Sequence, residues 1–220
     1  MATGAGERAL RVDAQRNQDR IVAAAHEAFA AEGYEVPIEE IARRAGVGPA
    51  TIYRRFPTKE RLLRAIFEAR LDDLEQAIAA AEAIPDPFAA LLAGMRALIE
   101  IQTANLVFLQ VLDQAGVMAE LKGELQTRIF DPLSSLFARA QASGEVRQDV
   151  DPSELPLLIQ MVTATAKHSP DCPSQGHAER YLMLLTDALR TPTPTVLPPG
   201  QSTAARENAR ATPTAGPISR

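Results

Sequence analysis

Residues 46–63, GVGPATIYRRFPTKERLL, concentrate positive charge in a chain that is acidic as a whole. The 220 residues include 23 Lys and Arg against 28 Asp and Glu, which gives a formal net charge of −5. Between Ile41 and Arg64, however, seven cations stand against one anion, Glu60. Because contacts with phosphate groups are local, such a positive face allows an acidic protein to bind nucleic acid.

Two short helices are predicted on either side of the glycine turn at residues 46–48. The first spans about residues 37–45 and has an apolar stripe at helical spacing. The second spans about residues 49–56 and ends at Pro57, after which Thr58 is a suitable N-cap for a long helix. Two short helices joined by a glycine turn describe a helix-turn-helix, whose second helix enters the major groove of DNA.

The outward face of the second short helix is the predicted DNA-contacting surface. If Ile52 and Phe56 face the core, Thr51 and Arg54 share an exposed strip that is expected to influence base preference. Lys59 falls in the first turn of the next helix, where an anion is favoured, so a phosphate partner is expected. The candidate DNA-contacting residues are Arg43, Arg44, Gly48, Pro49, Ala50, Thr51, Tyr53, Arg54 and Lys59. The alternative is a charged face that is merely solvated.

The rest of the chain also has a helical pattern, and no strand pattern appears, so the predicted fold class is all-α. A first helix is expected at residues 17–32, and the last two at about 153–168 and 175–189. Pro132 either caps a new helix together with Asp131 or kinks a long one. The predicted domains are a disordered N-terminus (1–15), the helix-turn-helix (16–62), a helical domain (63–190) and a disordered Pro/Thr-rich tail (191–220).

The stretch GYEVPIEEIARRAGVGPATIYRRFPTKERLLRAIFEARL, residues 33–71, resembles the DNA-binding domain of the TetR family of bacterial transcriptional regulators. The resemblance extends over about residues 16–75 and includes the glycine turn, the Thr51–Arg54 core and the segment that leads into the long helix. It implies that Tyr53 and Lys59 touch phosphates. The family often has Ser or Thr where Gly48 stands, so a side-chain phosphate contact or helix cap is expected to be missing.

The C-terminal part resembles the family only in general, as a variable helical domain for ligand binding and dimerisation. The resemblance implies a homodimer on a palindromic double-stranded DNA operator, mostly a repressor, released by a small and largely apolar ligand. The candidate dimer residues are Leu158, Val162, Tyr181, Leu182, Leu185 and Leu189. The candidate pocket residues, each of which is individually more typical of plain core, are Met95, Ile99, Phe108, Leu112, Met118, Leu121, Ile129, Phe137, Met161, Thr165 and His168.

Catalysis, metals, cofactors and membranes receive no support from the sequence. His26 and His177 are expected at the surface, and Cys172 is the one cysteine, so no metal site and no cofactor are predicted. No apolar run approaches the roughly 18 residues of a membrane span, and the expected location is the cytoplasm. Two alternatives stay open: a helical small-molecule-binding protein or enzyme whose N-terminal helices only pack, and a family member that binds DNA without a ligand or activates transcription.

Overall fold

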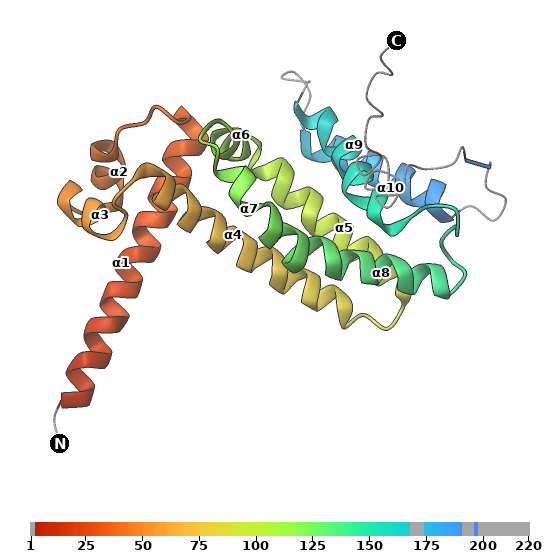
Figure 1. Cartoon of the computed structure of the whole chain (residues 1–220), viewed down its shortest axis with the longest axis horizontal. Coiled ribbons are helices and arrows are strands. Elements are labelled where there is room, and N and C mark those ends of the chain that lie inside the picture. Colours follow the sequence, from red (N-terminus) through yellow and green to blue (C-terminus); the bar gives the residue numbers. More distant parts are fainter. Residues whose placement is uncertain (1–2, 168–173, 191–195, 198–220) are drawn as a thin grey trace, which may run out of the picture. The chain divides into compact units, whose positions relative to one another are not determined.

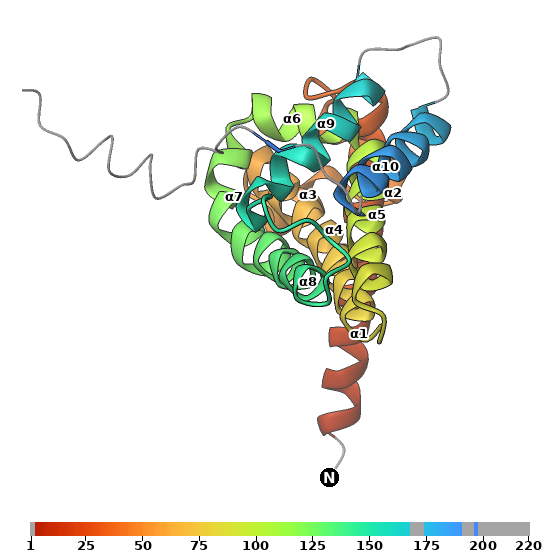
Figure 2. The same cartoon turned by 90° about the vertical axis from the view of Figure 1, so that its right-hand side faces the viewer.

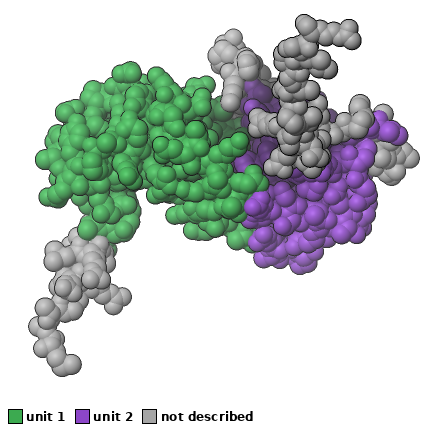
Figure 3. All heavy atoms as spheres, in the orientation of Figure 1, with its two compact units in different colours: residues 1–79, 100–129 green, residues 80–99, 130–220 purple. Residues whose placement is uncertain are grey.

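A computed structural model describes residues 3–167, 174–190 and 196–197, and every element in these ranges is a helix (Figure 1). The predicted all-α fold class is therefore confirmed. The chain divides into two compact units, of which unit 1 comprises residues 1–79 and 100–129 and unit 2 comprises residues 80–99 and 130–220 (Figure 3).

Unit 1 contains the predicted helix-turn-helix. Its elements are α1 (Thr3–Glu32), α2 (Ile38–Ala45), α3 (Pro49–Arg55), most of α4 (Lys59–Glu82), the end of α5 (Pro87–Ala104), α6 (Leu106–Gln114) and α7 (Val117–Leu125). Figure 1 shows α2 and α3 beside α1, and α2 packs against both neighbours. The core of this region is formed by Phe29, Ile41, Ile52, Leu62 and Ile66, all of which are fully buried. Each of the first four helices therefore contributes to one apolar centre.

The ends of these short helices follow from their residue types. Gly46 ends α2 in the left-handed region, with φ 66°, a conformation that glycine adopts without a steric penalty. Pro49 begins α3, where its missing N–H costs nothing, as the sequence predicts. The Thr58 hydroxyl accepts a hydrogen bond from the Arg61 backbone N–H at 3.3 Å, so Thr58 caps α4 as expected.

The first helix is longer than the sequence pattern predicts. It begins at Thr3 rather than Asn17, so most of the segment 1–15, which was expected to be disordered, has helical backbone. That segment, MATGAGERALRVDAQ, contains Ala, Glu, Leu, Arg and Gln, which have high helix propensity. Extending a helix that is already anchored in a core costs far less free energy than nucleating a new one. The polar composition of residues 1–15 therefore did not indicate where α1 begins.

Pro132 lies within a long helical segment. The segment runs through α7, a π-helical turn η1 (Gln126–Phe130) and α8 (Asp131–Ala142) without a non-helical residue. A proline lacks the N–H for the helical bond and its ring clashes with the carbonyl four residues earlier, and a π turn directly before it relieves both problems. The structure thus favours an interrupted long helix over an independent cap.

Unit 2 contains the end of α4, most of α5, and α8, η2 (Pro152–Glu154), α9 (Leu155–Lys167) and α10 (Ser174–Arg190). Figure 2 shows α9 and α10 side by side, and these two helices pack against each other. A Cβ added to Gly94 of α5 would lie 2.8 Å from Leu133 Cδ1 and 3.0 Å from Leu136 Cδ1. A side chain at this position would force the ends of Leu133 and Leu136 to shift, and glycine lets α5 and α8 pack without that shift.

Polar groups at the helix ends of unit 2 are satisfied locally. Asp86 accepts the Ala89 backbone N–H at 2.7 Å, and Asp151 accepts the Ser153 backbone N–H at 2.8 Å, so both residues act as N-caps. Arg139 donates to the carbonyls near the end of α4. The predicted disordered tail at residues 191–220 lies outside the described residues apart from Val196 and Leu197.

No single helix within the described ranges is long and apolar enough to cross a membrane. In the part of the chain that the structure describes, one pair of helices, α5 and α6, reaches that length and composition together, with a bend of 72° between them.

Candidate nucleic-acid interface

The orientation of α3 is the one that the sequence predicts. Ile52 is fully buried and Phe56 is 7% exposed, so both face the core. Tyr53 is 48% exposed, and Arg54 is exposed beside it, whereas Thr51 is partly exposed. The helix therefore presents a phenol, a guanidinium and a hydroxyl outward from a rigid apolar base.

The N-terminal end of α3 is low and side-chain-poor. Gly48, Pro49 and Ala50 are all exposed, and none of them carries a side chain longer than a proline ring. Gly48 occupies the N-cap position and makes no side-chain cap hydrogen bond. The turn leaves room for a bound molecule to approach the backbone closely, but it lacks the hydroxyl that Ser or Thr would supply.

Arg43 and Arg44 are engaged in ion pairs within the protein. Arg43 donates from Nε to Glu40 Oε2 at 2.8 Å and from Nη2 to Oε1 at 2.7 Å, and Arg44 pairs with both Glu40 and Glu32. These guanidinium groups lower the pKa of Glu40 to about 2. The positive window counted from Ile41 omits these acids, so its effective charge is smaller than the sequence suggests. A DNA contact by either arginine stays a prediction.

Lys59 makes a contact inside unit 1 that the sequence does not reveal. Its ammonium donates to the backbone carbonyl of Tyr34 and lies 4.5 Å from the centre of the Tyr34 ring and 5.6 Å from that of Phe29. The Tyr34 hydroxyl in turn donates to Glu60 at 2.9 Å, and this bond raises the pKa of Tyr34. Lys59 thus ties the α1–α2 loop to the start of α4, and its phosphate contact stays a prediction.

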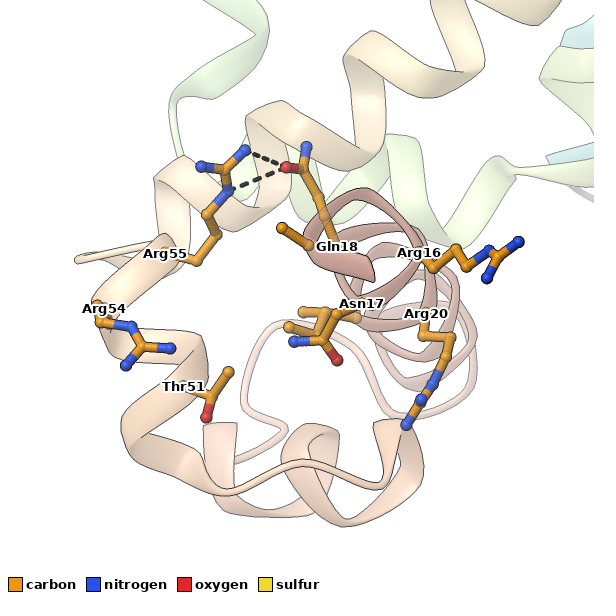
Figure 4. A pocket seen from close by; sticks show the side chains of 9 residues that line it. Arg16, Asn17, Gln18, Arg20, Thr51, Arg54 and Arg55 are labelled. Carbon is orange, nitrogen blue, oxygen red and sulfur yellow. Dashed lines mark hydrogen bonds between the residues drawn. The ribbon is translucent and has the colours of Figure 1, made fainter. Parts of the chain in front are cut away.

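A cavity of about 710 Å³ opens between α1 and α3 (Figure 4). It is lined by Ala14, Arg16, Asn17, Gln18, Arg20, Ile21, Thr51, Arg54 and Arg55, so it holds four arginines and no acidic residue. Two of these arginines brace the walls, because Arg20 donates to the Ala45 carbonyl at 2.7 Å and Arg55 donates to Gln18 at 2.9 Å. The sequence pattern gives no indication of the α1 side of this cavity.

His26 was expected at the surface, but its side chain makes contacts inside unit 1. It is only partly exposed, its Nε2 lies 2.6 Å from Asn105 Oδ1, and its ring meets Phe108 edge-on with the centroids 5.2 Å apart. Burial lowers the pKa of His26, and the nearby charge of Arg70 acts in the same direction. The imidazole is therefore a neutral connector between α1 and the α5–α6 break. Among the described residues no three His, Cys, Asp or Glu side chains are grouped so that they could hold a metal ion.

The candidate pocket residues fall in both units. Phe108, Leu112, Leu121 and Ile129 of unit 1 are buried, and Met118 is partly exposed. Met95, Ile99 and Phe137 of unit 2 are buried as well. Met161 is 64% exposed, so it does not line a cavity within this chain. Thr165 and His168 lie outside the described side chains, as does His177.

The candidate dimer residues divide between the core and the surface of unit 2. Val162, Leu182 and Leu189 are buried within the chain, Leu158 and Leu185 are partly exposed, and Tyr181 is 37% exposed. Three apolar side chains that the sequence analysis did not assign to this face are more exposed: Leu157 at 59%, Met161 at 64% and Leu184 at 55%. The most exposed apolar side chains of α9 and α10 thus lie next in sequence to candidate dimer residues, and the interface itself stays a prediction.

Comparison with known proteins identifies both halves of the chain. Residues 21–66 match the family model of bacterial regulatory proteins of the tetR family, and residues 86–191 match that of the C-terminal domain of SbtR-like transcriptional regulators. The HTH-type transcriptional regulator RutR of Escherichia coli O157:H7 is 31% identical over 180 residues, which cover 79% of this chain and 82% of RutR.

Solved structures agree with this match. The TetR transcriptional regulator SCO0520 from Streptomyces coelicolor is 34% identical, with a TM-score of 0.63 over 80% of this chain and 99% of that one. A TetR regulatory protein from Mycobacterium vanbaalenii is also 34% identical, with a TM-score of 0.62 over 83% of this chain and 99% of that one. The sequence, the helix-turn-helix geometry and these relatives agree: the chain belongs to the TetR family of DNA-binding transcriptional regulators, which are not enzymes.

Proposed function

We propose that the protein is a homodimeric repressor that binds a palindromic operator and is released from it by a small ligand. The observation that carries the DNA contact is the outer side of α3, where Tyr53 and Arg54 project from a helix whose inner side is fully buried. Next to it lies the arginine-lined α1–α3 cavity, which provides the positive potential that attracts a phosphate backbone.

Dimerisation is supported by the apolar side chains that α9 and α10 leave exposed. Leu157 and Met161 are four residues apart on α9, and Tyr181 and Leu184 are three apart on α10, so each pair shares a helix face. Exposed apolar patches of this kind mark interaction sites. A two-fold dimer that reads half-sites one turn of DNA apart needs its two α3 helices about 34 Å apart.

Ligand binding is proposed for the helical domain C-terminal to α4. Buried Phe and Met side chains such as Phe108, Phe137 and Met95 suit a largely apolar guest. A ligand that binds more tightly to an arrangement of the helices that does not fit the operator lowers the affinity for the operator. The size of this effect is the coupling free energy between the two sites. A coupling of about 1–3 kcal/mol changes operator affinity roughly 5- to 150-fold.

The experiment compares purified protein with its Tyr53→Ala variant on fragments of the source genome, using nuclease footprinting at about 0.15 M salt. We expect a protected inverted repeat with the parent protein and none with the variant. Tyr53 is exposed, so its loss leaves the fold intact. Equal footprints would show that α3 is not the DNA-contacting helix.

Ligand release and the direction of regulation need a second assay. Transcription from a promoter that contains the footprinted site is measured in vitro with and without protein, while apolar compounds are screened for recovery. Repression relieved by a compound supports the proposal. Increased transcription on adding the protein would establish an activator instead.

A further inference from the structure

The α1–α3 cavity contains polar side chains that the protein itself leaves unused. Within the described part of the chain, the side chains of Asn17, Thr51 and Arg54 make no hydrogen bond or ion pair, although Asn17 and Thr51 are partly buried. In Figure 4, Asn17 projects from α1 into the space that Thr51 and Arg54 border from α3. The polar atoms of Asn17 and Thr51 are open to solvent, so they stay free to bind a ligand that enters the cavity.

The walls around these three residues are fixed. Arg20 is held by its bond to the Ala45 carbonyl at the end of α2, and Arg55 by its bond to Gln18. The fixed arginines therefore keep positive charge at the rim while Asn17, Thr51 and Arg54 stay available. An anionic ligand requires hydrogen-bond donors that are held in place and are not already bonded, with no acidic residue beside them, and the α1–α3 cavity has these properties.

The dimensions of DNA indicate which part of a bound duplex lies against the cavity. An α-helix with side chains is about 10–12 Å across, and the major groove is about 12 Å wide, so α3 fills the groove alone. A neighbouring helix that flanks α3 must then lie over the strand that borders the groove. The α1–α3 cavity consequently faces the sugar–phosphate backbone and not the base edges.

We infer that the α1–α3 cavity binds a phosphodiester of the operator strand, and that Asn17 of α1 is a DNA-contacting residue. Thr51 and Arg54 share its ligand, so they contact the backbone and do not select bases, contrary to the expectation from the sequence. Base selection then falls to the N-terminal end of α3, with Pro49 and Ala50, while Tyr53 keeps the phosphate contact that the family resemblance implies. The inference rests on the docking of α3 in the major groove.

The test uses full-length protein and two matched pairs of charge variants. Asn17→Asp places a negative charge in the cavity, and Asn17→Lys places a positive one there. Gln76→Glu and Gln76→Lys make the same charge changes on the exposed side of α4, within unit 1 but away from the cavity. Fluorescence anisotropy measures binding to the inverted-repeat duplex that the protein selects and to an unrelated duplex, across a series of salt concentrations.

We expect Asn17→Asp to weaken binding about tenfold or more on both duplexes, because a hydrogen bond to a charged group is replaced by repulsion. Asn17→Lys is expected to tighten binding and to steepen the salt dependence by about one unit of slope, and misfolding cannot produce that result. The Gln76 variants are expected to differ from the parent protein by less than about twofold.

Three outcomes would overturn the inference. If both Asn17 variants behaved like their Gln76 controls while Tyr53→Ala lost binding, α3 would contact DNA and the cavity would not. If Arg54→Ala changed the selected bases instead of weakening all duplexes alike, Arg54 would be a base-contacting residue. If no variant, Tyr53→Ala included, altered binding, the DNA-contacting role of α3 itself would be wrong.

Discussion

The Nε2 atom of His26 lies 2.6 Å from the Oδ1 atom of Asn105, and this contact joins α1 to the break between α5 and α6. The Asn105 amide nitrogen donates to the Ile101 carbonyl at 2.7 Å, so its oxygen is the acceptor and His26 carries its proton on Nε2. The other ring nitrogen, Nδ1, faces Arg70 Nη2 at 3.5 Å. Both nitrogens thus suit a neutral imidazole, and a protonated one would oppose the guanidinium.

Stability is therefore expected to decrease in mild acid. Burial, with help from the Arg70 charge, lowers the pKa of His26 from 6.5, against smaller opposing effects of Asn105 and Glu27. Below pH 6.5 the unfolded chain binds a proton that the folded chain resists, so the free energy of unfolding decreases as the pH decreases. Urea unfolding of parent protein and a His26→Gln variant at pH 7.5, 6.5 and 5.5 measures this. Identical pH dependence in the two proteins would exclude a role for His26.

Lys59 is expected to affect both stability and DNA affinity. Lys59→Ala removes the ammonium contact with the Tyr34 carbonyl and the two aromatic rings, which costs about 1–2 kcal/mol of unfolding free energy. If Lys59 also contacts phosphate, the variant weakens binding on all duplexes and lowers the salt slope by about one unit. Thermal unfolding and salt-dependent anisotropy separate the two effects. An unchanged salt slope would restrict Lys59 to its structural role.

The outer face of α9 and α10 is expected to hold the dimer together. Leu157→Asp and Leu184→Asp each place a charge among apolar side chains that a partner would bury, so the protein should become monomeric and lose operator affinity. Val107→Asp is the control, because Val107 is 45% exposed on α6 of unit 1. Sedimentation equilibrium reports the mass. A dimer that persists in both leucine variants would place the interface elsewhere.

Replacing either of two helical glycines by alanine is expected to change the stability of the protein, in opposite directions. Gly94→Ala forces a Cβ against Leu133 and Leu136, and overpacking of this kind costs about 1–3 kcal/mol. Gly123→Ala in α7 meets nothing within 4 Å and should stabilise the protein by about 0.5–1 kcal/mol through helix propensity. Chemical unfolding compares the two variants. A neutral Gly94→Ala would mean that α5 and α8 have room to move apart.

The sequence correctly predicted those features of the fold that depend on residues close together in the chain. The spacing of Ile52 and Phe56 correctly oriented α3, and the caps at Thr58, Asp86 and Asp151 lie where the residue types indicate. These features depend on a residue and its near neighbours, which a single sequence displays directly.

Contacts between distant segments were not predictable in the same way. Asn17 and Thr51 line one cavity only after α1 and α3 have packed, and nothing in the pattern around Asn17 indicates this. His26 contacts Asn105 and Phe108, which are far away in the sequence, so its near neighbours did not reveal these contacts. On α9 the apolar stripe is wide, and spacing alone could not decide that Val162 faces the core and Met161 faces outward. Such choices depend on tertiary packing.

The measurement that tests the central claim most directly is selection of bound duplexes from a random pool by the purified protein at about 0.15 M salt. A dimeric TetR regulator predicts enrichment of an inverted repeat whose half-sites lie about 34 Å apart along the DNA. Binding that enriches no sequence and disappears as the salt concentration rises would reflect nonspecific charge attraction alone, and would contradict sequence-specific regulation by this protein.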